Sequence, residues 1–206
     1  MRPYLLLILI CSAILTGCHS EQKDFVRRNK PRIDVKIAAL FERVDNFFRQ
    51  EEDLDYDELE TQSYNLLKEL DSLEWEHELN FWKAQYLGVD RELYLHDPNS
   101  GPSIFPDEVS EMHTANWEYA VRLLNLVALR VRSPYEFVTF LEQDGVCWDN
   151  LWPSGYRLSE LFDDRFGDDP NYDSEKTKSQ ILKQYEKSEQ IGDQRSEILF
   201  QWRRNR

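Results

Sequence analysis

The sequence predicts an all-α protein of about six or seven helices that pack into one compact helical domain. Apolar residues recur every three or four positions along most of the 206-residue chain, which is the spacing of amphipathic helices. Alternating patterns that would indicate β-strands are missing, and residues 92–96 provide the only, poor candidate. Because 41% of the residues are hydrophobic and only 7 are glycine, the composition is that of a globular protein with a sizeable core.

Helix signals follow one another along the first half of the domain. A first amphipathic helix is expected over residues 34–50. A second starts near Asp55, and a third covers residues 72–87, either separate from the second or fused with it. Gly88 stands where a left-handed residue would end this helix, and the prolines that follow predict a loop over residues 88–111.

The second half continues the helical pattern. The most apolar stretch, residues 114–132, is expected to form the central buried helix, with Trp117 in its buried stripe. Ser133-Pro134-Tyr135-Glu136 combines a capping box with proline at the first helical position, so the next helix begins there. A short helix over residues 157–166 and a long helix over residues 174–203 complete the prediction.

The N-terminus has the pattern of a secretory signal peptide. Residues 1–17 contain one positive charge, at Arg2, then an apolar run and small residues before Cys18. The apolar run is shorter than the roughly 20 residues that a spanning helix needs, so a transmembrane anchor is the less favoured alternative. An ordinary cleaved signal followed by an incidental cysteine is the other alternative.

Leu15-Thr16-Gly17-Cys18, at the end of this segment, resembles the lipobox of bacterial lipoproteins. The resemblance implies that residues 1–17 are removed and that acyl chains on Cys18 anchor the mature protein in the bilayer. His19 follows the cysteine, and under the sorting rule of enteric bacteria a residue other than Asp there implies the outer membrane, with the protein facing the periplasm. No specific family is indicated for the mature domain.

The mature chain divides by charge into a basic tether and an acidic domain. Residues 18–33 carry more Lys and Arg than Asp and Glu, so we expect a short tether beside the membrane. Residues 34–206 are expected to form the acidic helical domain. The whole chain has 39 Asp and Glu against 25 Lys and Arg, a formal charge of −14. Such a charge repels nucleic acids and favours protein partners with a basic surface.

Motifs of familiar enzymes are missing from the sequence. It contains neither a nucleophile elbow, a phosphate loop nor a Rossmann glycine pattern, and no two histidines have zinc-ligand spacing on a helix. Asp53, Asp55 and Asp57 alternate as in a calcium loop, but Glu58 stands where that loop needs glycine. We therefore expect a protein without a cofactor, a metal or catalytic residues. Cys147, the remaining cysteine of the mature domain, is expected to be a small buried hydrophobe rather than a reactive thiol.

Two acidic clusters and two tryptophans are the candidate partner-binding residues. The acidic candidates are Glu51, Glu52, Asp53, Asp55, Asp57, Asp163, Asp164, Asp168 and Asp169. Trp148 and Trp152 lie in a turn-rich stretch, where one of them could serve as a binding anchor. The alternatives are that the acids form solvated surfaces and that both tryptophans pack in the core.

These features together indicate a lipid-anchored, periplasm-facing protein-binding module. The most specific version of this hypothesis is an immunity or inhibitor protein whose acidic face neutralises a basic toxin or envelope-degrading enzyme. One alternative is a structural accessory lipoprotein of an envelope secretion or assembly complex. The other is a cell-wall or lipid hydrolase with dispersed carboxylates, for which the sequence singles out no pair.

Overall fold

The computed structural model confirms the all-α prediction. It describes residues 3–94, 107–143, 146–147 and 152–204, and these form helices and turns but no β-strand. The elements in chain order are α1 (Pro3–Gln50), the 3-10 helix η1 (Glu51–Asp53), α2 (Tyr56–Leu87), α3 (Asp90–Leu93), α4 (Asp107–Arg130), α5 (Pro134–Leu141), α6 (Trp152–Phe166) and α7 (Ser174–Arg204). The seven α-helices of the described chain pack into one helical domain.

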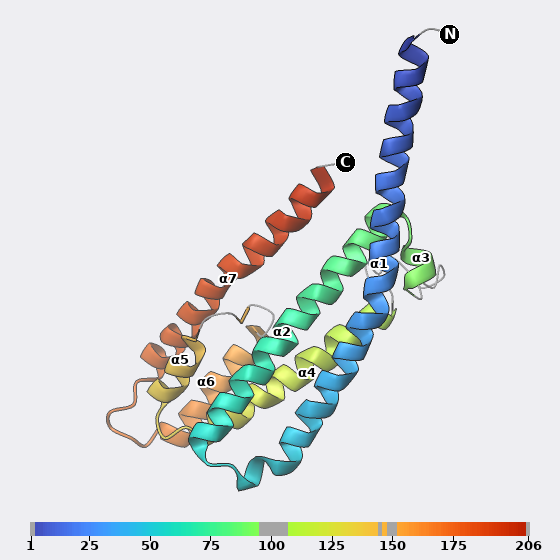
Figure 1. Cartoon of the computed structure of the whole chain (residues 1–206). Helices are drawn as coiled ribbons and strands as arrows, with labels where there is room; N and C mark the ends of the chain where they lie inside the picture. The colour runs from blue at the N-terminus through green and yellow to red at the C-terminus, as the bar shows by residue number, and fades with distance from the viewer. Residues whose placement is uncertain (1–2, 95–106, 144–145, 148–151, 205–206) are drawn as a thin grey trace.

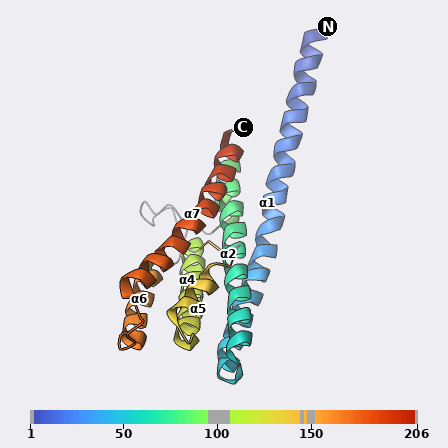
Figure 2. The ribbon, with the colours of Figure 1, turned by 90° about the vertical axis from the view of Figure 1, so that its left-hand side faces the viewer.

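The helices are arranged as a bundle with both chain termini at one end. α1 and α2 form an antiparallel pair joined at η1, and α4 packs against α2 (Figure 1). α7 packs on α5 and α6 and then runs back toward the end of the molecule where the chain begins (Figures 1 and 2). The first turns of α1 extend beyond the other helices in both views. None of the described helices combines the length and the apolar character that are needed to cross a membrane.

Two hydrophobic cores hold the bundle together. The larger core takes residues from six helices and includes the fully buried rings of Phe137, Phe140 and Phe162. The smaller core lies nearer the termini, where Phe81 packs edge to face against Tyr94 with 5.2 Å between ring centroids. Fully burying one such side chain contributes about 1.5–3 kcal/mol, so tertiary packing rather than intrinsic propensity stabilises these helices.

Three helix ends have the local structure that the sequence predicts. Asp55 caps α2, because its carboxylate accepts a hydrogen bond from the backbone N–H of Glu58. Gly88 ends α2 in the left-handed conformation, with φ of 69°. Ser133 caps α5 by accepting from the backbone N–H of Glu136, whose carboxylate accepts in turn from the backbone N–H one residue before the cap.

The segment predicted to be a tether is instead part of the folded bundle. Residues 18–33 continue α1 without a break, and the helix runs through Pro31. Val26, Lys30 and Ile33 are at most 4% exposed. They are spaced four and three residues apart and so share one helix face. This buried stripe was not predicted because Lys30 and its basic neighbours made the segment look solvent-exposed.

Other expectations about individual elements also need correction. Trp117 is 37% exposed rather than part of the central core. The buried face of α4 lies beside it and consists of Asn116, Ala120, Leu123, Leu124, Val127 and Ala128. α4 begins at Asp107 rather than near residue 114. α2 continues unbroken through residues 72–87, so of the two alternatives for this segment the fused helix is the one that forms. The start of the strand candidate at residues 92–96 lies in helix α3.

Candidate functional site

The first acidic cluster lies in the connection between α1 and α2. Asp55 has a structural role there, because its Oδ1 accepts the hydrogen bond from Glu58 N at 2.9 Å that starts α2. Glu51 is half-buried in η1. Glu52, Asp53 and Asp57 are exposed, as is Asp55. The positive end of the α2 helix dipole favours carboxylates in this first turn, which explains how the chain holds so many of them together.

The second acidic cluster lies where α6 ends and the chain turns into α7. Its members are Asp163, Asp164, Asp168 and Asp169. Hydrogen bonds from Ser174 and from the Tyr172 hydroxyl, which lies 2.7 Å from Asp163 Oδ1, hold the pKa of Asp163 below its usual value. Asp169 Oδ1 accepts from the backbone N–H two residues further on at 2.8 Å. All four side chains are exposed, and those of Asp163 and Asp169 also order the turn.

The structure brings the two acidic clusters to the same end of the bundle. Arg130, at the end of α4, donates from Nη2 to the carbonyl oxygen of Leu54 at 2.8 Å. Arg165, in the last turn of α6, donates from Nη2 to the carbonyl oxygen of Val131 at 2.9 Å and also bonds to Ala128 O. Both contacts involve the C-terminal end of α4, so residues 51–57 and 163–169 lie on either side of it, at the lower end of the molecule in Figure 1.

Negative charge at this end is only partly neutralised. Arg130 and Arg165 donate these hydrogen bonds to backbone carbonyl oxygens at helix ends and turns rather than to the carboxylates of the clusters. Burial raises the pKa of Glu60, and the nearby charges of Asp57 and Glu136 raise it further. Burial and the charges of Glu60 and Glu136 likewise raise the pKa of Tyr56. The lower end therefore presents a negative potential that is suited to a positively charged partner.

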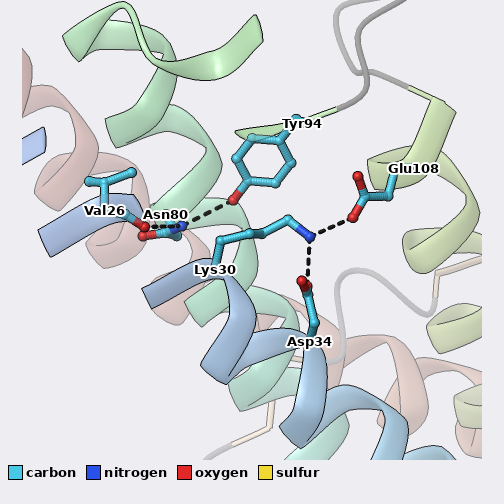
Figure 3. Close-up of polar contacts among 6 residues, drawn as sticks. All are labelled: Val26, Lys30, Asp34, Asn80, Tyr94 and Glu108. Atoms are coloured by element: carbon cyan, nitrogen blue, oxygen red, sulfur yellow. Dashed lines mark hydrogen bonds and ion pairs between the residues drawn. The ribbon is translucent and has the colours of Figure 1, made fainter. Parts of the chain in front are cut away.

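A buried ion-pair cluster that the sequence analysis missed lies between α1, α2 and α4 (Figure 3). Lys30 is 4% exposed, and its Nζ contacts Asp34 Oδ1 at 2.6 Å and a carboxylate oxygen of Glu108. The same ammonium lies 5.0 Å from the ring centroid of Tyr94, whose hydroxyl accepts from Asn80 at 3.2 Å. Only the four-residue spacing from Val26 to Lys30 could have indicated that this lysine faces inward.

A second group of buried polar side chains lies earlier in α2, around Asp71 and Glu74. Arg195 of α7 donates two hydrogen bonds of 2.6 and 2.8 Å to the carboxylate of Asp71. Burial raises the pKa of Asp71, and the hydrogen bonds and charge of Arg195 partly offset this rise. Burial lowers the pKa of His113, but its hydrogen bond and charge interaction with Glu74 outweigh burial and raise it. The cavity beside Asp71, Glu74 and Asn116 measures about 20 Å³, which is room for one water molecule rather than a substrate. These groups therefore hold helices together.

The remaining sequence-based candidates have mixed outcomes. Cys147 is 4% exposed and its Sγ lies 3.7 Å from Ser188 O, as expected of a small buried side chain. Trp148 lies outside the described residues. Trp152 begins α6, but its side chain lies outside the described part of the structure. No group of three or more His, Cys, Asp or Glu in the described chain is arranged to hold a metal ion.

Three comparisons with known proteins were made for this chain. No protein-family model, no curated protein and no solved structure matches it. Its function is therefore inferred from its own residues.

Proposed function

We propose that the mature chain is a lipid-anchored, periplasm-facing immunity or inhibitor protein that binds a basic protein through its acidic end. We define the acidic end as the exposed acids of the two clusters that neither cap a helix nor order a turn: Glu52, Asp53, Asp57, Asp164 and Asp168. The lipobox-like residues that precede Cys18 support the anchor, and His19 supports placement in the outer membrane.

The observation that carries this proposal is the position of the acidic end relative to the anchor. The two clusters are more than a hundred residues apart in sequence but lie on either side of the C-terminal end of α4. Cys18 and Gln50 belong to the same helix, α1, and 32 residues at 1.5 Å per residue separate them by about 48 Å. A protein anchored at Cys18 therefore holds its acidic end far from the lipid surface.

This geometry suits the capture of a cationic partner. A patch of like charges steers an oppositely charged protein toward it and raises the rate of association. An enzyme that holds an anionic polymer in a positively charged cleft would be blocked by an acidic end that enters the cleft. The lipid anchor would keep this inhibitor concentrated where the envelope needs protection.

The proposal is tested by affinity capture from native envelopes, with the full lipidated chain as bait and mass spectrometry as the readout. The test variant neutralises exposed acids that cap no helix: Asp53→Asn, Asp57→Asn, Asp164→Asn and Asp168→Asn. We expect the wild-type chain to recover one basic secreted protein at stoichiometric yield, and the variant to lose it. Added salt should weaken the wild-type complex because it screens exposed charges.

A matched control separates the acidic end from net charge. It removes four exposed acids elsewhere: Glu111→Gln, Glu118→Gln, Glu186→Gln and Glu189→Gln. Equal loss of the partner in both variants would contradict the proposed site, and recovery of envelope-assembly subunits instead would favour the accessory-lipoprotein alternative. Replacing Cys18 by Ser should abolish acyl labelling, and labelling that persists would contradict the anchor.

A further inference from the structure

An apolar groove lies at the end of the bundle opposite the acidic end. It is formed by the early part of α1, the last turns of α2 and the last turn of α7, and measures about 210 Å³. Phe25, Leu87 and Trp202 form most of its apolar wall, and Lys83 lies at its side. Phe25 is 54% exposed, and together with the groove it offers apolar surface to a partner.

Aromatic side chains extend this groove across α2 and α7. The rings of Trp82 and Tyr86 stack with 6.0 Å between their centroids, and Tyr86 lies 5.8 Å from Trp202. All three side chains are half-buried, so each is partly accessible at the surface. Tryptophan and tyrosine are the residues that gather at membrane–water interfaces, because their rings are apolar at one end and polar at the other.

Helix register places this groove beside the lipid-bearing residue. Positions 18, 22 and 25 are four and three residues apart, so they share one face of α1, and residues 22 and 25 line the groove. Seven residues of helix span about 10 Å. The headgroup layer of a bilayer is roughly 5–8 Å thick. A lipid on Cys18 would therefore hold the groove at the membrane surface.

The charge around the groove suits lipid headgroups rather than a basic protein. Beside the groove, α1 carries Lys23, Arg27 and Arg28 against Glu21 and Asp24, and the last turn of α7 adds Arg204. Glu21 lines the groove and Arg27 pairs with Glu92, so the excess of positive charge there is small. Lys83 is half-buried and lines the groove beside Leu87 and Trp202, and burial lowers its pKa. Such lysines cover apolar side chains with their methylene groups and direct the ammonium to headgroup oxygens.

We propose that this groove, with Phe25, Trp202 and Lys83, docks on the phospholipid headgroup layer of the same leaflet that holds the lipid of Cys18. The domain then lies against the membrane at its α1–α2–α7 end, and its acidic end points away from the lipid. This inference rests on the lipid anchor of the proposed function but not on the identity of the protein partner.

Tryptophan quenching in vesicles tests the docking. The lipidated chain is reconstituted into phosphatidylethanolamine–phosphatidylglycerol vesicles that contain phospholipids brominated near their headgroups. We expect the wild-type fluorescence to be quenched, and Trp202→Phe to lose a large part of that quenching because it removes the closest probe. Trp117→Phe, which removes an exposed tryptophan of α4 away from the groove, should keep it.

A second pair of variants tests the contact itself. Phe25→Asp replaces an exposed side chain, so it should fold, and it should reduce the quenching at least about two-fold. Val35→Asp makes the same change at a 70% exposed position further along α1 and should not. Far-ultraviolet circular dichroism checks that both remain helical.

The outcomes separate this inference from the proposed function. An acylated, vesicle-bound protein that is not quenched, or that loses quenching equally in Phe25→Asp and Val35→Asp, overturns the docking and leaves the anchor intact. A protein without acyl chains on Cys18, shown by mass spectrometry, overturns the anchor and the docking together. Quenching that persists when no basic partner is captured supports the docking and contradicts only the partner proposal.

Discussion

The buried Lys30 is neutralised by two carboxylates, and this redundancy leads to a quantitative prediction. Its side chain is 5% exposed, whereas those of Asp34 and Glu108 are 46% and 37% exposed. Either carboxylate alone can still compensate the ammonium when the other is replaced by an amide. The variants Asp34→Asn and Glu108→Gln should therefore each cost little, whereas the double variant leaves a charge buried without a partner.

The burial of each group sets the expected magnitudes. Removing one exposed carboxylate should cost up to about 1 kcal/mol, which is typical of an exposed ion pair. Removing both should cost about 3–5 kcal/mol, the penalty for stranding one member of a buried pair. The two substitutions should thus couple by about 1–3 kcal/mol, as neighbours in one network do. The contact of Lys30 with the Tyr94 ring remains in all variants and contributes less than the lost charge pair.

Urea unfolding followed by circular dichroism measures this coupling. The free energy of unfolding is obtained for the wild type, both single variants and the double variant, with an unchanged m-value as the check on two-state behaviour. The control is Glu76→Gln, which breaks the exposed Lys36–Glu76 pair and should cost about 1 kcal/mol or less. If the double variant loses no more free energy of unfolding than the two single variants lose together, Lys30 is not buried with these two partners and the reasoning is refuted.

Two further predictions follow from burial. Trp117→Ala should cost about 1 kcal/mol or less in urea unfolding because the ring is 37% exposed, whereas Phe81→Ala, at a 2% exposed position, should cost about 3–5 kcal/mol; similar losses would show that α4 is rotated. His77 is 1% exposed, and burial lowers its pKa to about 4. As the pH falls, His77 therefore becomes protonated in the unfolded chain before it does so in the folded one. The stability that neutral His77 provides is complete above about pH 6.5 and is lost as the pH falls toward 4, by about 3 kcal/mol. The free energy of unfolding of His77→Gln should depend less on pH over this range than that of the wild type. Equal dependence in the two proteins would contradict the burial of neutral His77.

Local sequence signals predicted three helix ends correctly. The cap at Asp55, the left-handed Gly88 and the capping box at Ser133 all depend on hydrogen bonds between residues within one or two helical turns. Such contacts form wherever the chain becomes helical, whatever packs against it. Only the surrounding bundle decided that Trp117 faces outward, because the residue beside it on α4, Asn116, faces α2 and bonds to Glu74.

The candidate site was predictable as residues but not as an arrangement. The sequence shows that both acidic clusters are too dense in charge to be buried, and the structure leaves Glu52, Asp53 and Asp57 exposed. It does not show that the clusters lie at the same end of the bundle, because this depends on Arg130 and Arg165 bonding to backbone carbonyl oxygens far away in sequence.

The sequence by itself determined the all-α class, the capped helix ends and the two acidic segments. Each of these follows from the spacing and type of residues within a few positions of one another. The tertiary structure alone decided that residues 18–33 join the bundle, that Lys30 is buried, and which ends of the helices lie together. Burying an ammonium is favourable only where distant carboxylates such as Glu108 come to meet it, and that meeting depends on how whole helices pack rather than on any local pattern.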